Sequence, residues 1–355
     1  MWRTRGHDGI VDLLKVSLAQ GRVSHAYLIT GPDHTGKGTL ARELALALNC
    51  TAWQGEPQGS LFGGVGEAHT AEPGPCYECA ACRKALAGSH PDLMLVEQWT
   101  TGERGIVDQI RGIQYASGLR PFEARWKVYV LLNAQDLTLA AQNALLKTLE
   151  EPAPTVCIIL AAATPQALLP TVVSRCQQLQ LRPPSSEAIA LALEELTELA
   201  PAEAQNLAAL AAGRIGWAIQ AAEGPTLLLA RQQALDQLRR VLGAGTADRF
   251  RAAEALAAQA PEAVDDTLQL WLAWLRDVLL MVEGQGQRIV NRDQQEALDR
   301  AAEALDSRQV QRAIRAVQTA RWQVDSSVNT RMAVEVLMLR LPALGVVGRQ
   351  AGTLT

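Results

Sequence analysis

The sequence predicts an α/β domain followed by an all-helical remainder, and three observations support this fold class. Apolar runs that suit strands alternate with helical stretches over roughly the first 180 residues, as in sheets with crossover helices. A glycine-bounded loop that contains a lysine follows the first of these runs. Strand signals stop after Leu181, and the 355-residue chain is long enough for two or three domains.

The elements of the α/β part follow in order along the chain. A helical stretch over Gly9–Gln20 precedes the first strand. The predicted strands are continuous apolar runs rich in Val, Ile and Leu, which is typical of strands buried on both faces. They are Ala26–Thr30, Asp92–Val96, Lys127–Leu132 and Val156–Ala161. Between the first two strands, Thr51–Pro75 is rich in Gly and Pro without periodicity, so we predict an inserted loop there.

Two helical domains are predicted after the α/β domain of residues 1–181. Ser185 and Ser186 supply N-capping chemistry at the start of a small helical domain, residues 182–224. A larger Ala- and Leu-rich helical domain spans residues 225–343, and we expect the tail, residues 344–355, to be loosely ordered.

Apolar residues in the larger helical domain mark its core. Trp271 and Trp274 are three apart and share a helix face. A further stripe recurs at helical spacing, and it consists of Val310, Ile314, Val317, Val324 and Val328. We expect both groups to pack in the interior rather than to bind a ligand.

Composition excludes several classes of protein. Hydrophobic residues make up 48% of the chain and charged residues 20%, far from the composition of disordered proteins. No apolar run approaches the roughly 18 residues that span a bilayer, and the first residues lack the apolar core of a secretory signal, so we expect a cytoplasmic protein. The net charge of −4 argues against a surface that binds nucleic acid throughout.

The loop after the first strand has the layout of a phosphate-binding loop. Gly31 and Gly36 bound it, Lys37 supplies positive charge, and a helix through Leu40–Asn49 follows. Such loops place Ser or Thr directly after the lysine to hold magnesium, but this chain has Gly38. Thr39 comes one residue later, about 100° further around the helix, so its hydroxyl does not simply replace the missing one.

A second magnesium position is also changed. An ATPase of this kind needs a metal-binding Asp and a water-polarising Glu at the end of a neighbouring strand. The strand that begins at Lys127 ends instead in Leu132 and Asn133, and we expect Asp136 to cap the helix that starts near Thr138. We therefore predict a nucleotide fold that does not hydrolyse ATP on its own; whether ATP or ADP still binds stays open.

Four cysteines form a candidate metal site. Cys76, Cys79 and Cys82 are spaced by two residues, and Cys50 closes a helix just before the inserted loop. Four thiolates that converge suit a closed, tetrahedral, structural Zn²⁺ site. His90 is a candidate ligand only if Cys50 is not one, and we expect Cys157 to be buried packing within its strand.

Several motifs together resemble the clamp-loader branch of the AAA+ family. They are the run NALLKTLEEP at Asn143–Pro152, SRC at Ser174–Cys176, SHAYL at Ser24–Leu28 and, more weakly, NTRMAVEVLMLRL near the end of the chain. The resemblance implies an AAA+ domain with a zinc-binding insertion, a helical lid domain and a helical collar domain that assembles a five-subunit ring.

The resemblance also implies a role and partners. The chain is similar to the ring member that acts as a rigid stator and does not hydrolyse ATP, with Arg175 reaching as a trans-acting arginine finger into the ATP site of a neighbour. A guanidinium placed there stabilises the transferring phosphoryl group. Implied partners are the ATPase subunits and the delta subunit of a hetero-pentamer, the sliding clamp indirectly, and primer-template DNA. Thr164 and Arg214 lie near positions where active relatives sense nucleotide, but we assign them no such role.

Two other functions stay open from the sequence. One is an AAA+ ATPase that uses Lys37 with an unusual magnesium arrangement, either as an active clamp-loader subunit or as a DNA-dependent ATPase. The other is a zinc-bearing nucleic-acid module. The helix start at Gly105–Arg111 could receive a DNA phosphate, although Ile106 and Ile110 equally fit an ordinary amphipathic helix.

Overall fold

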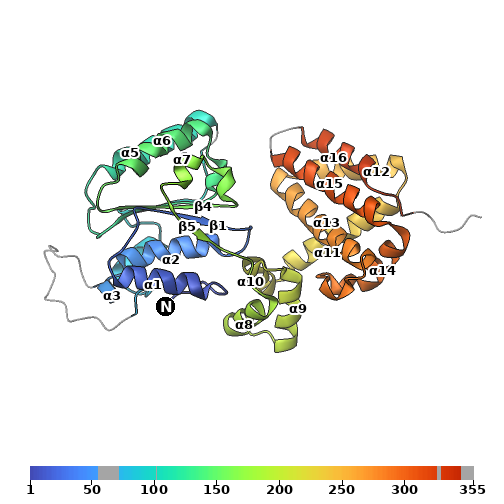
Figure 1. Ribbon diagram of the computed structural model, residues 1–355, viewed down its shortest axis with the longest axis horizontal. Helices are drawn as coiled ribbons and strands as arrows, with labels where there is room; N and C mark the ends of the chain where they lie inside the picture. Colours follow the sequence, from blue (N-terminus) through green and yellow to red (C-terminus); the bar gives the residue numbers. More distant parts are fainter. Residues whose placement is uncertain (55–71, 101, 326–328, 345–355) are drawn as a thin grey trace, which may run out of the picture. The chain divides into compact units, whose positions relative to one another are not determined.

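The computed structural model describes residues 1–54, 72–100, 102–325 and 329–344 (Figure 1). The chain divides into two compact units, Met1–Ile219 and Gln220–Thr355. The first unit contains a sheet with helices, and the described part of the second is helical. The finer division into domains at residues 181 and 224 stays a prediction, and the predicted tail from residue 345 lies outside the described residues.

A five-stranded parallel sheet forms the centre of the first unit. Its strands lie in the order β2-β3-β4-β1-β5, and every neighbouring pair runs parallel. The bounds are β1 Ala26–Thr30, β2 Leu93–Val96, β3 Lys127–Leu131, β4 Val156–Ala162 and β5 Gln177–Gln180. The four predicted strands are thus confirmed within one residue at each end, and β5 was missed.

Burial explains where the strand prediction worked and where it was wrong. β1 and β4 lie inside the sheet and are buried at every residue, as their apolar runs predicted. β2 is an edge strand, and the expectation that it is buried on both faces was wrong because Met94 is 41% exposed. At the other edge, β5 buries only Leu179 among three glutamines, so it has no apolar run to detect.

Helices cover both faces of the sheet (Figure 1). α1 (Asp8–Ala19) and α2 (Lys37–Asn49) pack on one face together with Tyr27 and Ile29 of β1. Helices on the opposite face pack against Ala26 and Leu28. They are α5 (Glu103–Ser117), α6 (Leu139–Glu150) and the short α7 (Pro170–Val173). This three-layer arrangement confirms the predicted α/β class.

Three helices follow the last strand of the first unit. They are α8 (Ser186–Leu196), α9 (Pro201–Ala211) and α10 (Ile215–Glu223). As predicted, Ser185 caps α8, with its hydroxyl oxygen accepting the N–H of Ala188 at 3.2 Å. The N–H of Gly216 donates to the carbonyl oxygen of His34 at 2.8 Å, which attaches the start of α10 to the glycine-bounded loop.

The second unit is a bundle of helices around one apolar core. Trp271 and Trp274 are fully buried, and the indole N–H of Trp271 donates to the carbonyl of Ala234 at 2.8 Å. The predicted stripe lies in the same core, except that Val328 is outside the described residues. The helices are α11 (Thr226–Gly243), α12 (Thr246–Ala257), α13 (Pro261–Val282), α14 (Gln295–Ala304), α15 (Ser307–Asp325) and α16 (Thr330–Arg340).

The segment predicted as an inserted loop begins as a helix. α3 covers Thr51–Gln54, so the expectation of a loop from residue 51 was wrong there, and most of the remainder lies outside the described residues. The cysteine-rich segment then leads into α4 (Ala80–Leu86). In the part of the chain that the structure describes, no helix combines the length and the apolar character needed to cross a membrane.

Candidate functional site

The loop between β1 and α2 has the backbone of a phosphate-binding loop. Gly36 is the N-cap of α2 and takes a left-handed conformation with φ of 95°, which favours glycine. Gly31 is required for a different reason, because a Cβ there would lie 2.6 Å from the carbonyl oxygen of Leu181. The buried Thr35 donates its hydroxyl hydrogen to the carbonyl of Pro32 at 2.7 Å. The loop is therefore closely supported by its surroundings.

The lysine of this loop is bound by the loop itself. The ammonium group of Lys37 donates to the carbonyl oxygens of Gly31 at 2.6 Å and Pro32 at 2.8 Å. It also pairs with the carboxylate of Asp33 at 3.2 Å. A phosphate would have to compete with these acceptors for Lys37.

The two positions where an active ATPase would hold magnesium lie close together. A Cβ built on Gly38 would lie 3.6 Å from Cδ1 of Leu132, so Leu132 is a near neighbour of Gly38, and neither residue carries the hydroxyl or the carboxylate that would hold the ion. Leu132 is buried, with 9% of its surface exposed. The same Cβ would lie 3.2 Å from the guanidinium of Arg42, which pairs with Glu97 at 2.5 Å. Arg42 thus brings a positive charge close to Gly38.

The backbone turns directly after β3, at Asn133. Asn133 adopts a left-handed conformation (φ 52°), and its side-chain amide donates to the carbonyl of Glu97 at 3.4 Å. The expectation that Asp136 caps the next helix was wrong. Thr138 is the N-cap of α6, and its hydroxyl oxygen accepts the N–H of Ala141 at 3.2 Å. Thr138 has the β-region backbone that an N-cap needs, whereas Asp136 belongs to a 3-10 turn.

Arg175 pairs with an acidic residue at the end of α6. Its guanidinium pairs with the carboxylate of Glu150 at 2.7 Å and donates to the carbonyl of Thr171 at 2.8 Å. The side chain keeps 35% of its surface exposed. The NALLKTLEEP and SRC motifs therefore meet in the fold through Glu150 and Arg175. Glu150 was not singled out from the sequence, although it lies inside the first motif.

Arg175 and Lys37 lie at opposite ends of the neighbouring strands β1 and β5. Gln177, two residues after Arg175, pairs with Tyr27 near the start of β1, whereas Lys37 follows the end of that strand. The five residues of β1 span about 16 Å at roughly 3.3 Å per residue. Arg175 therefore lies at the end of the strands away from the phosphate loop of its own chain.

The four predicted cysteines meet at the C-terminal end of α2. Their Sγ atoms all lie within 4.8 Å of one another, and those of Cys76 and Cys82 are 3.9 Å apart. A tetrahedral zinc ion with Zn–S bonds of about 2.3 Å would separate its sulfurs by about 3.8 Å. Cys50 belongs to the group, which removes the reason to consider His90. The donor set and spacing fit a closed structural metal site.

Backbone N–H groups donate hydrogen bonds to two of these sulfurs. Cys76 Sγ accepts the N–H of Cys79 at 3.2 Å and that of Glu78 at 3.4 Å. Cys79 Sγ accepts the N–H of Cys82 at 3.5 Å. A hydrogen bond from the thiol of Cys82 lowers the pKa of Cys50 to about 5, although burial opposes this shift. Burial raises the pKa of Cys76, and the hydrogen bond to Cys50 raises the pKa of Cys82. Such N–H···S bonds favour metal-binding thiolate over thiol.

A buried carboxylate on α2 ties the N-terminal segment to the cysteine-rich segment. Glu43 is 2% exposed and accepts the N–H of Thr4 at 2.9 Å, and it is also hydrogen-bonded to Arg3 and to the hydroxyl of Tyr77. Burial and the Glu43 carboxylate raise the pKa of Tyr77. The α-amino group of Met1 donates to the carbonyl of Pro75 at 2.5 Å. The sequence signal for Glu43, a lone acid in the run LARELALAL, was missed.

Four other residues considered in the sequence analysis lie in places that favour a role in packing or local structure. Cys157 is fully buried in β4, as predicted, and burial raises its pKa. His90 is buried and its Nδ1 accepts the N–H of Asp92 at 3.1 Å. The guanidinium of Arg214 lies 5.4 Å from the ring centroid of Trp217. Thr164 precedes a 3-10 turn without capping it through its side chain.

The segment Gly105–Arg111, considered above as a place for a DNA phosphate, belongs to α5, which packs as an ordinary amphipathic helix. Ile106 and Ile110 of α5 are buried against the sheet, as the alternative interpretation predicted. Arg111 is exposed and pairs with Asp108 at 3.4 Å. Nothing in this geometry favours a DNA contact at α5.

Comparison with known proteins places the chain in a family. The family model described as "DNA polymerase III, delta subunit" matches residues 6–185, which is half of the chain. A second model, "DNA polymerase III, delta subunit, C terminal", matches residues 225–342.

Curated relatives include two subunits of DNA polymerase III from Bacillus subtilis (strain 168). The chain is 35% identical to subunit delta' over 180 residues, 51% of this chain and 49% of that protein. It is 35% identical to subunit tau over 184 residues, 52% of this chain and 29% of that protein. The chain thus spans half or less of the length of these relatives.

Among solved structures, a DNA polymerase III gamma subunit-related protein from Thermotoga maritima is similar over 93% of this chain and 97% of its own, with 15% identity and a TM-score of 0.46. The family models carry the assignment, because they match both the α/β part and the helical part in order. The chain belongs to the DNA polymerase III delta-subunit family.

Proposed function

We propose that this chain is the delta-prime subunit of a bacterial DNA polymerase III clamp loader. It serves as the stator of a hetero-pentamer with ATPase subunits and a delta subunit, and helps to load the sliding clamp onto primer-template DNA. It is thereby a component of a DNA-directed DNA polymerase holoenzyme rather than an independent enzyme. Its cysteine cluster holds a structural zinc ion.

The proposal that this chain does not hydrolyse ATP is supported by the residues at Gly38 and Leu132. Both groups that would hold magnesium are replaced, and a Cβ built on Gly38 would lie near both Leu132 and Arg42. Without the ion, charge that develops on the β- and γ-phosphates has no metal to neutralise it. The loop keeps its shape because its backbone is fixed by close contacts rather than by a nucleotide.

The observation that carries the proposal is the place of Arg175. It lies at the strand ends opposite its own phosphate loop, is partly exposed, and pairs with Glu150. This position supports a role for the guanidinium at a nucleotide held by another subunit rather than by its own loop. There it would stabilise the equatorial phosphoryl oxygens in the transition state, an effect worth about 10³ to 10⁵ in rate.

The test is DNA-dependent ATP hydrolysis by a reconstituted clamp loader that contains this chain. Arg175→Ala should lower hydrolysis by about 10³-fold or more at the neighbouring site. The exposed Arg182 offers a matched control, and Arg182→Ala should leave the rate unchanged. Assembly of each complex is checked by size-exclusion chromatography. An unchanged rate in an assembled Arg175→Ala complex would contradict the proposal.

The second candidate is an ATP-hydrolysing clamp-loader subunit that uses Lys37, and the identity to subunit tau favours it. It predicts magnesium-dependent ATP turnover by the isolated chain that Lys37→Ala abolishes. A silent isolated chain excludes this candidate.

A further inference from the structure

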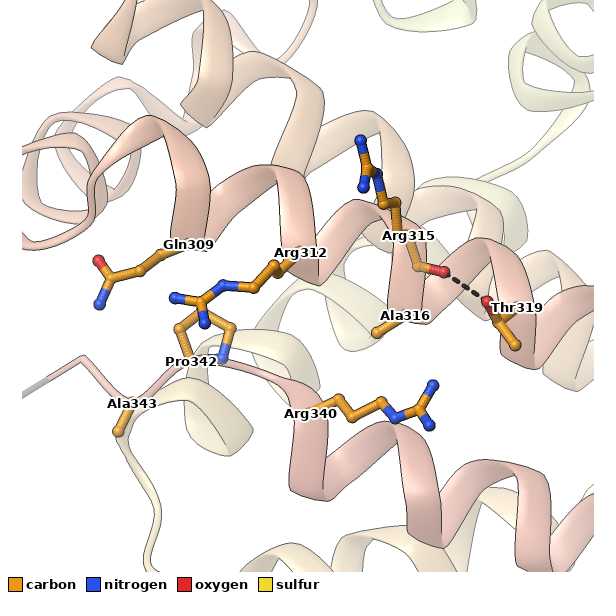
Figure 2. A pocket seen from close by; sticks show the side chains of 8 residues that line it. All are labelled: Gln309, Arg312, Arg315, Ala316, Thr319, Arg340, Pro342 and Ala343. Atoms are coloured by element: carbon orange, nitrogen blue, oxygen red, sulfur yellow. Dashed lines mark hydrogen bonds between the residues drawn. The ribbon is translucent and has the colours of Figure 1, made fainter.

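A groove with a cavity of about 510 Å³ lies between α15 and α16 in the second unit (Figure 2). Its polar lining is dominated by three exposed arginines, Arg312 and Arg315 of α15 and Arg340 of α16. Thr319 also lines it, and its hydroxyl donates to the backbone carbonyl of Arg315 at 2.8 Å. The groove contains no Asp or Glu among its lining residues.

The charges of these arginines are not compensated within the described part of the chain. None of the three guanidinium groups has an ion pair or hydrogen bond there. Two other arginines of the same helices are paired. Arg321 of α15 pairs with Asp265 at 2.7 Å, and Arg331 of α16 pairs with Glu335 at 2.9 Å. The groove is therefore a local basic surface in an acidic protein.

The exposed face of α15 continues the basic surface as a stripe. Its residues are spaced by three or four positions, which places them on one side of the helix, and they are Arg308, Arg312, Arg315, Thr319 and Trp322. Trp322 is 66% exposed, an unusual position for the largest apolar side chain. From Ser307 to Val324 the helix has no acidic residue. The stripe is about 21 Å long at roughly 1.5 Å per residue.

The arrangement of the guanidinium groups favours an extended ligand. In Figure 2, Arg315 points away from Arg340, and Arg312 extends toward Pro342. Groups that spread along a groove suit a polyanion with several separate charges better than one small phosphate. Arginine binds phosphate oxygens bidentately, and an exposed tryptophan provides a face on which an unpaired base can stack.

We propose that the stripe on α15, together with Arg340, binds single-stranded DNA through its phosphate backbone and through stacking on Trp322. A single strand is preferred over a duplex because bases inside a duplex are already stacked and cannot use the tryptophan. This inference deepens the proposed function by naming where this chain itself meets DNA. It is tested by binding alone, so its failure is distinguishable from failure of the arginine-finger proposal.

The experiment measures binding of a fluorescent oligothymidylate to the full chain by fluorescence anisotropy as salt is varied. Three phosphate contacts predict a slope of log K against log salt of about −2, which lowers affinity roughly 16-fold between about 50 and 200 mM salt. The triple variant Arg312→Gln, Arg315→Gln, Arg340→Gln should lose about tenfold or more in affinity and flatten the slope. Trp322→Ala should weaken binding by about fivefold or more with little change in slope.

A matched control removes three exposed arginines elsewhere in the same unit, Arg251, Arg276 and Arg300. It changes the net charge equally and should leave affinity and slope unchanged. Circular dichroism melting checks that each variant is folded.

Three results would overturn the inference. The first is no binding by the wild-type chain at low salt, and the second is equal binding by the groove variant and the control. The third is binding of a poly-glutamate peptide or of a duplex as tight as that of the single strand, without dependence on Trp322. Poly-glutamate binding would point to an acidic protein partner instead.

Discussion

The two ends of α2 differ in the metal-binding side chains that lie there. At its N-terminal end the backbone of a phosphate loop is kept, but Gly38 and the nearby Leu132 stand where groups that bind magnesium would be expected. At its C-terminal end four cysteines converge to within 4.8 Å, with N–H donors already directed at their sulfurs. The comparison teaches that backbone shape and metal chemistry are separable. Close packing can preserve a loop after its ligands are gone, whereas a metal site requires the side chains themselves.

Removing a cysteine ligand should have the largest effect. Cys82→Ala leaves three ligands at a site whose metal contributes on the order of 10 kcal/mol to folding in small zinc modules, so we expect a loss of several kcal/mol and release of zinc. Metal content is measured by elemental analysis and stability by urea unfolding. Cys176→Ala, a cysteine outside the cluster, should keep a full complement of zinc. Zinc bound equally by both variants would rule out the assignment.

Placing a carboxylate at the other end of α2 tests whether magnesium can return. Leu132→Asp buries a charge against Gly38 and should destabilise the protein by about 3 kcal/mol. Leu132→Met keeps the apolar volume and should cost less than about 1.5 kcal/mol. Because Arg42 brings positive charge to the same place, magnesium should not restore the stability of the Asp variant. A rise in melting temperature on adding magnesium would show that the site is still competent.

The middle of α2 can be tested through Glu43. Glu43→Gln removes acceptor capacity from several buried hydrogen bonds of the N-terminal and cysteine-rich segments, so we expect a loss of about 2 kcal/mol in urea unfolding. The control is Glu123→Gln, since Glu123 pairs with Lys84 at the surface and should contribute less than about 1 kcal/mol. Equal effects of the two substitutions would mean that Glu43 does not join the segments.

The smallest expected effect concerns the orientation of Arg175. Glu150→Gln keeps a hydrogen-bond acceptor but removes the charge, and we expect about a tenfold loss of ATP hydrolysis in the reconstituted complex, far less than that of Arg175→Ala. Stability should change by less than about 1 kcal/mol because the ion pair is partly exposed. Glu151→Gln, one residue further on, is the control. No difference between these two variants would remove Glu150 from the positioning of the arginine.

Much of the fold and of the metal site could be predicted from the types of residues that are neighbours in the sequence. β1, β3 and β4 are apolar runs that can only be buried, and the cysteine spacing indicated one metal site before any geometry was known. β5 was not predictable, because its pairing comes from β1 and its own residues are mostly polar. The cap of α6 was misassigned because Asp136 and Thr138 have equally suitable side chains, and only their backbone conformations distinguish them.

By itself, the sequence determined the α/β class, the loss of both magnesium ligands and the four cysteines, because these depend on which side chains are present. Tertiary structure decided which of them meet. It placed Leu132 beside Gly38, joined Glu150 to Arg175 at the strand ends opposite the phosphate loop, and left Arg312, Arg315 and Arg340 without acidic partners among the described residues. These pairings link residues far apart in the chain, and only the packing of helices on the sheet and in the bundle brings them within contact distance.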